Sequence, residues 1–101
     1  MLLARVVGEV VSTHKDSKID NLKFLLVEKV QPSAAKSNKD YLVAIDSVGA
    51  GLGDVVLVVQ GSSARMTDET TGRPCDAAIM AVVELVSEEG SVVYDKSKDT
   101  Y

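Results

Sequence analysis

The sequence predicts a small, mainly β protein: a five-stranded, OB-like β-barrel, closed or nearly closed, with one short helix. Three observations lead to this prediction. Five or six short apolar runs alternate with clusters of turn residues. Valine is abundant among the hydrophobic residues, which make up 46% of the chain, and its branched side chain favours strands. A length of 101 residues fits one domain with one modest core.

The first half of the chain is predicted to supply four strands. We place them at residues 2–13, 22–30, 40–46 and 54–60. Gly8 lies in the middle of the first strand, which predicts a bulge or a tight barrel bend there. The stretch 31–39 contains Pro32 and Asn38 and is expected to be a surface loop.

The second half is predicted to begin with the helix. Asp76 is expected to cap a short helix over residues 77–81, because its carboxylate can accept free backbone N–H groups of the first turn. This helix would plug one end of the barrel. A fifth strand is expected at 81–86 and a short last strand at 91–95, with a turn between them.

The limits of the domain follow from the same pattern. The barrel domain is expected to span residues 1–95, and residues 96–101 are expected to form a polar tail that frays. No apolar segment approaches the roughly 20 residues that cross a bilayer, and the N-terminus lacks the pattern of a signal peptide. Cys75 is the single cysteine and cannot form an internal disulfide, so a reducing compartment is expected.

The overall charge bears on possible partners. The net charge of −4 argues against a nucleic-acid partner and against an anionic membrane surface, because both require a basic patch. Aromatic residues make up only 4% of the chain, so the stacking platforms of single-strand binding are scarce as well. No nucleic acid and no membrane is therefore expected as a partner.

The fourth predicted strand is apolar on both faces. Its side chains alternate, with Val55, Leu57 and Val59 on one side and Val56 and Val58 on the other. One face can fill the core of the domain. The other face needs a second cover, and a chain this short has little left to supply one. The simplest cover is another copy of the same protein.

Residues that could carry chemistry are few. His14 is the single histidine and lies in a polar loop, so a solvated or structural role is favoured over catalysis or metal binding. Cys75 is interpreted as a packing residue rather than a reactive thiol. No catalytic set can be assembled, so we expect no enzyme activity, no metal and no cofactor. Asp46 ends a strand beside a glycine turn and is expected to accept backbone N–H bonds there.

Two loops remain as candidate sites. The glycine-rich turn 49–53 invites comparison with a phosphate-binding loop, but a β-type run follows it instead of a helix, so a tight turn is favoured. The second loop, 61–65, could hold an anion through its amides and hydroxyls beside Arg65. Alternatively, Arg65 could pair with a carboxylate at a subunit contact. The sequence leaves these two interpretations equally open.

Several segments together resemble the EutN/CcmL family, the pentameric vertex proteins of bacterial microcompartment shells. The most specific are the runs Asp46-Ser47-Val48-Gly49-Ala50-Gly51 and Gly61-Ser62-Ser63-Ala64-Arg65. Further matching segments lie, in family order, at residues 3–13, 23–27, 43–54, 56–58, 61–65 and 74–80. Two positions depart conservatively, with Ala81 where the family often carries Gly and Glu84 where it carries Asp.

The resemblance implies a five-stranded OB-like barrel that assembles into a cyclic pentamer. It implies a structural protein at the five-fold vertices of a carboxysome or metabolosome, inside the bacterial cytoplasm, with itself and hexameric shell proteins as partners. It also implies that the two loops lie near the subunit contacts and the five-fold axis; the residues concerned are Gly49, Ala50, Gly51, Ser62, Ser63 and Arg65. The alternative is an OB-like binding module for a small anion or nucleic acid.

Overall fold

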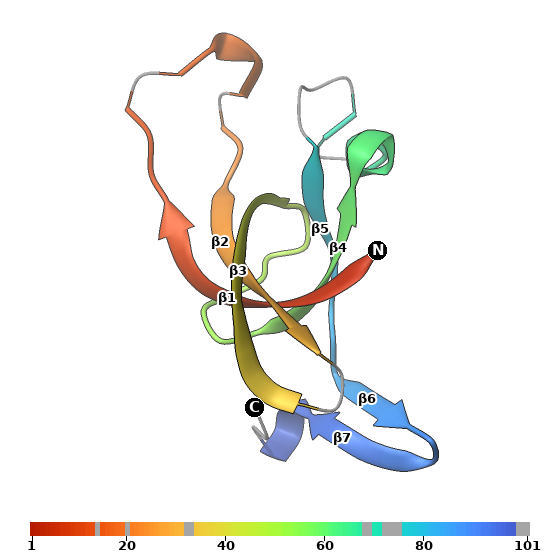
Figure 1. Ribbon diagram of the computed structural model, residues 1–101. Coiled ribbons are helices and arrows are strands. Elements are labelled where there is room, and N and C mark those ends of the chain that lie inside the picture. Colours follow the sequence, from red (N-terminus) through yellow and green to blue (C-terminus); the bar gives the residue numbers. More distant parts are fainter. Residues whose placement is uncertain (14, 20, 32–33, 68–69, 72–75, 99–101) are drawn as a thin grey trace.

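Five strands form a closed barrel in the order β1-β2-β3-β5-β4, and β6 and β7 form a separate two-stranded sheet (Figure 1). The computed structural model describes residues 1–13, 15–19, 21–31, 34–67, 70–71 and 76–98, with the backbone alone for 34–39. The strands are β1 (Leu2–Val10), β2 (Phe24–Gln31), β3 (Ala34–Asp46), β4 (Val55–Gln60), β5 (Ala77–Val82), β6 (Leu85–Glu88) and β7 (Ser91–Asp95). Within these described ranges, three short 3-10 helices also occur, η1 (Ser17–Ile19), η2 (Gly61–Arg65) and η3 (Lys96–Lys98). The predicted five-stranded barrel is confirmed.

Small and branched residues fill the barrel. The buried interior residues are Ala4, Val6, Leu25, Val27, Ala44, Ala50, Val56, Val58, Ala77 and Ile79. They alternate along the strands with outward-facing residues, as the pleat of a strand requires. A five-stranded barrel has a narrow interior, so alanine and valine fill it where larger side chains would not fit. Across the described part of the chain, no helix is both long and apolar enough to span a membrane.

The bulge predicted at Gly8 is present. The pairing of β1 with β2 shifts register between Val6 and Gly8, so that Val6 lies opposite Val27 and Gly8 opposite Leu26. The strand ends at Val10, three residues before the predicted end.

The loop predicted at 31–39 is wrong over most of its length. Strand β3 begins at Ala34, and the β2–β3 hairpin continues to the pairs Val30–Ser37 and Gln31–Ala34 through two register shifts. The polar composition of this stretch was misleading because an antiparallel ladder satisfies its backbone groups whatever the side chains are.

The helix predicted over residues 77–81 is also wrong, because this segment is strand β5. It pairs antiparallel with β4 and, at two positions, parallel with β3, and so closes the barrel. The helix propensity of its alanines is worth only tenths of a kcal/mol per residue, far less than the strand pairing and burial gained here. The predicted fifth strand at 81–86 is divided, since β5 ends at Val82 and β6 begins at Leu85. No helix closes the barrel among the described residues, and Ala50, from the loop between β3 and β4, adds its side chain to the core.

The seam between β3 and β5 is the shortest in the barrel. Its pairs are Ile45–Ala78 and Asp46–Ile79, and both are parallel. Just beyond them, the Ser47 hydroxyl donates a hydrogen bond to the carbonyl oxygen of Ile79. By contrast, β4 and β5 share five paired positions.

The chain itself covers most of the outer face of β4, where another copy was expected as the simplest cover. Val55 is fully buried and Val59 is 4% exposed. Val59 packs with Ala64 of η2 and Ala78 of β5. The expectation failed because η2 packs against the outer face of the sheet at Val59. Leu57, midway along the strand, remains half-buried.

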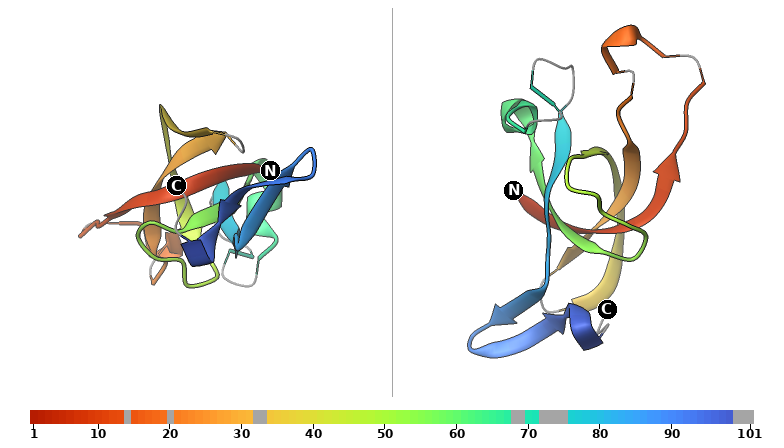
Figure 2. Two further views of the ribbon diagram at one scale, coloured as in Figure 1. Left: turned by 90° about the horizontal axis from the view of Figure 1, so that it is seen from below. Right: turned by 180° about the vertical axis from the view of Figure 1, so that it is seen from behind.

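The β6–β7 hairpin projects from the end of the barrel opposite η2 (Figures 1 and 2). Its turn has positive φ at both Glu89 (51°) and Gly90 (82°), the signature of a tight hairpin turn, and confirms the predicted turn. Tyr94 is 3% exposed and anchors the hairpin. The Lys96 N–H donates to the Glu84 carbonyl oxygen at 2.9 Å, so the chain stays attached at the start of the predicted tail.

Candidate assembly surfaces

A single carboxylate organises the start of the glycine-rich turn. Asp46 ends β3, and its Oδ1 accepts hydrogen bonds from the backbone N–H groups of Val48 (3.1 Å), Gly49 (3.0 Å) and Ala50 (3.1 Å). This confirms the predicted role of Asp46. Charge-assisted bonds of this kind are about twice as strong as neutral ones, so the turn is held in one shape.

A second carboxylate organises the end of the same turn. Asp54 Oδ2 accepts a hydrogen bond from the Gly51 N–H at 2.9 Å, and its Oδ1 accepts one from Lys96 Nζ at 2.9 Å. The Gly51 hydrogen bond, followed by the Lys96 interaction, holds the pKa of the Asp54 carboxyl below its usual value. The same ion pair raises the pKa of Lys96. The turn is thereby fastened to the C-terminal hairpin.

This arrangement excludes a phosphate-binding role for the turn. The N–H groups of Val48, Gly49, Ala50 and Gly51 already donate to carboxylates of the chain itself. Two carboxylates in the turn would also repel an anion. Strand β4 follows the turn, where a phosphate loop needs a helix.

The three predicted site residues of this turn have different environments. Gly49 has φ +80°, which favours glycine, and is exposed. Ala50 is 2% exposed and its side chain belongs to the barrel core. Gly51 is exposed without a positive φ, and a Cβ there would lie 3.8 Å from the nearest atom, Asp54 Oδ2. Gly49 and Gly51 are therefore accessible to a neighbour, and Ala50 supports them from inside.

The second loop is the 3-10 turn η2. It starts at Gly61, which has φ +66° and whose N–H donates to the Asp76 carbonyl oxygen at 2.8 Å. Ala64 is fully buried against the sheet. The three predicted site residues here, Ser62, Ser63 and Arg65, are all exposed. Within the described part of the chain, Arg65 forms no salt bridge.

Two threonines that sequence reasoning missed lock η2 in place. Thr70 is fully buried; its hydroxyl donates to the Ala64 carbonyl oxygen at 2.6 Å and accepts the Thr67 N–H at 3.2 Å. The hydroxyls of Thr67 and Thr70 lie 2.6 Å apart, and the Thr70 N–H donates to Thr67 Oγ1 at 3.1 Å. The spacing Thr67–Thr70 could have signalled a side-chain turn motif, since threonine hydroxyls bond to the backbone three residues away.

The structure does not bring the two loops together. The turn 49–53 leads into one end of β4, and η2 leaves the other end (Figure 1). A strand of six residues separates them by roughly 20 Å. Any single feature built from both loops therefore needs more than one copy of the chain.

The remaining candidate chemistry has little support. His14 and Cys75 lie outside the described residues. Among those described, no group of three or more metal-binding side chains occurs. Of the aromatic residues, Tyr94 is buried, Phe24 is half-buried and Tyr41 is 52% exposed, so the described surface has no row of stacking rings. Nothing here favours the alternative of a nucleic-acid module.

Two open hollows of about 330 Å³ each lie near the β1–β2 end of the barrel. One is lined by Val10 and Phe24 together with Glu9, Lys15 and Lys23, and thus by charges of both signs. The other lies beneath the turn 49–53 and is bordered by Leu52, which is 79% exposed. Neither hollow holds a concentration of one charge.

The described residues form a small closed barrel with internally braced loops and exposed apolar side chains. The model of the family described as "Ethanolamine utilisation protein EutN/carboxysome" matches residues 1–84. The chain belongs to this EutN/CcmL family.

Relatives match over nearly the full length. The carboxysome shell vertex protein CcmL of Synechococcus elongatus is 42% identical, covering 95% of this chain and 96% of the relative. The bacterial microcompartment shell vertex protein EutN of Escherichia coli is 36% identical, covering 95% and 100%.

Solved structures agree. CcmL of Gloeobacter violaceus has a TM-score of 0.91 at 36% identity, covering 96% of this chain and 99% of that one. The GrpN pentameric microcompartment shell protein from Rhodospirillum rubrum has a TM-score of 0.75 at 35% identity, covering 87% and 98%.

Proposed function

We propose that this chain is a structural protein that forms pentameric caps at the five-fold vertices of a bacterial microcompartment shell. The observation that carries the proposal is the end-to-end match, in sequence and in structure, to shell vertex proteins. Similar identities to vertex proteins of two different compartments, 42% and 36%, fit a shared role in the shell rather than a shared cargo.

The proposed partners are other copies of the chain and flat hexagonal shell proteins. Hexagons alone tile a plane, so a closed polyhedron needs five-fold points, and a pentamer supplies them. A subunit that is rigid before it assembles loses less conformational entropy when the ring forms. The turn 49–53, which is held by two carboxylates, and η2, which is held by a threonine, provide that rigidity.

The exposed loop residues are the proposed contact and axis positions. Gly49 and Gly51 on the turn, with Ser62 and Ser63 on η2, are small enough for several backbones to converge. Arg65 is proposed to act electrostatically at the contact. Arg65→Glu is therefore expected to weaken the oligomer in a salt-sensitive manner, measured by sizing chromatography with light scattering. Lys98→Glu, the same charge change on exposed η3, is the matched control and should leave the oligomer intact.

Native mass spectrometry tests the proposal directly. The expected mass is five times the 10.7 kDa of the chain. A stable monomer at micromolar concentration would contradict the proposed function. Co-expression with hexagonal shell proteins should then give closed polyhedra, and omission of this chain should leave open sheets or tubes.

A further inference from the structure

The outer face of β4 and β5 carries no charge. These neighbouring strands have six residues each, none of them charged, in a chain that is 26% charged. Leu57 points outward because Val56 and Val58 point into the core. It is flanked by Leu3 on β1 and Ala81 on β5, its register partners. These three half-buried residues and Met80 are called the β4–β5 face below.

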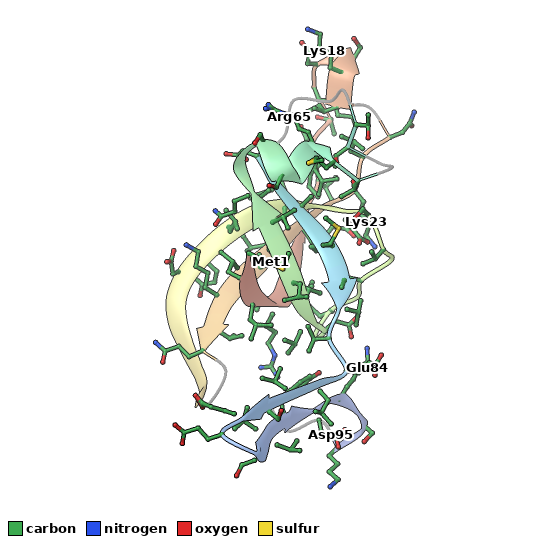
Figure 3. All side chains as sticks on the ribbon, turned by 90° about the vertical axis from the view of Figure 1, so that its right-hand side faces the viewer. Met1, Lys18, Lys23, Arg65, Glu84 and Asp95 are labelled. Atoms are coloured by element: carbon green, nitrogen blue, oxygen red, sulfur yellow. The ribbon has the colours of Figure 1, made fainter. Side chains whose placement is uncertain are left out.

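Met80 stands out from this face. The pairing of β4 with β5 skips it, since Leu57 lies opposite Ala81 and Val58 opposite Ile79. Met80 is thus the extra residue of a bulge, a feature that re-aims a side chain, and it is 36% exposed. Met1, 79% exposed, lies beside β4 at the edge of the face (Figure 3).

A second apolar face lies on β2 and β3. Leu25, Val27 and Ala44 point inward, so their neighbours Leu26 and Val43 point outward. Leu26 is paired with Val43 on one side and with Gly8 on the other, where a Cβ would lie 3.7 Å from the Leu26 Cβ. Val43 is 43% exposed and Tyr41, at the border, 52% exposed. The residues Gly8, Leu26, Tyr41 and Val43 are called the β2–β3 face below.

Charge limits what can cover the β4–β5 face. Burying an uncompensated charge against an uncharged surface is costly. The β6–β7 hairpin is a poor fit, since residues 84–95 carry four carboxylates and no basic group. Beside the β2–β3 face, Lys29 Nζ lies 3.4 Å from Asp40 Oδ2, so these two charges are matched within the chain.

We propose that the β4–β5 face of one subunit packs on the β2–β3 face of the next copy of the chain, with Met80 directed toward Gly8 and Leu26. The two faces differ, and β2 and β4 are not neighbours in the barrel. A contact between two different faces is head-to-tail, and head-to-tail contacts form a ring when the rotation from one subunit to the next closes on itself. The inference rests on the proposed pentamer and adds which surfaces meet in it.

The test uses one glutamate on each face and one off both faces. Met80→Glu and Val43→Glu should each raise the dissociation constant of the ring by at least about 100-fold and so give monomers. Circular dichroism should show unchanged strand content in both variants. Val92→Glu is the matched control, since Val92 is 57% exposed on β7 and should leave the ring intact. A cyclic ring repeats one contact, so two faces that each abolish it lie on its two sides.

The outcomes separate the inference from the proposed function. An intact ring with either Met80→Glu or Val43→Glu overturns the assignment of that face. A wild-type ring of another size that both changes dissociate supports the faces and contradicts the pentamer. A wild-type dimer means that one face packs on itself, which overturns the head-to-tail contact. If a glutamate variant fails to fold, Met80→Gln and Val43→Thr should each weaken assembly by about 10-fold, and unchanged assembly again overturns the assignment.

Discussion

Replacing Thr70 with valine should destabilise the protein through the loss of one buried hydroxyl. The Thr70 hydrogen goes to the Ala64 carbonyl oxygen, so the hydroxyl of Thr67 must donate to Thr70. Thr70→Val therefore removes the acceptor of the Thr67 N–H and one hydrogen bond to the Ala64 carbonyl oxygen, at a residue that water does not reach. Each unsatisfied buried group costs about 1–3 kcal/mol, so we expect a loss of about 2–3 kcal/mol.

Thermal unfolding at one fixed protein concentration measures this effect, because assembly makes the midpoint depend on concentration. The expected fall is roughly 10–20 °C for a chain of this size. Thr71→Val is the matched control, since exposed Thr71 makes a single hydroxyl bond, to the Thr67 carbonyl oxygen, and should cost no more than about 1 kcal/mol. Equal effects of the two changes would refute the argument from burial.

Three further predictions concern the turn between β3 and β4. The lowered pKa of Asp54 means that its ionised form stabilises the fold fully above about pH 4 and loses this effect as the pH falls further. Asp54→Asn should therefore reduce the change in the free energy of unfolding, measured in urea, between about pH 5 and pH 3. An unaltered dependence on pH would contradict this. Gly53→Ala should cost about 1 kcal/mol because φ is +88°, whereas Gly51→Ala should cost less than about 0.5 kcal/mol, so equal urea midpoints would argue against backbone strain. Gly51→Trp should give monomers on a sizing column where Gly51→Ala gives rings; an intact Gly51→Trp ring would place this turn away from the contacts.

Sequence reasoning succeeded where a local pattern and the fold required the same structure. The bulge at Gly8, the cap at Asp46 and the turn at Glu89–Gly90 are each determined by one residue type with special backbone or hydrogen-bonding properties. These features depend on neighbours in sequence, so they are visible without the fold.

The errors lie where distant segments decide the structure. The segment 77–82 is alanine-rich and was expected to be partly helical, yet the free edges of β4 and β3 turn it into the strand that closes the barrel. Likewise, Ala64 and Ala78 cover Val59, a contact between segments that no local pattern connects. The place of the Ala50 side chain in the barrel core likewise depends on distant strands, and no local pattern indicates it.

The two-pair seam between β3 and β5 also sets where the barrel opens. Every other junction in the barrel is a longer antiparallel ladder, so separating β3 from β5 breaks the fewest backbone bonds. Local opening follows the path of lowest free energy, so the amides along this seam should exchange with solvent before those in the middle of β1 and β2. A barrel that opens at one short junction keeps its β1–β2–β3 sheet intact, and β5 can pair with that sheet again when the barrel closes.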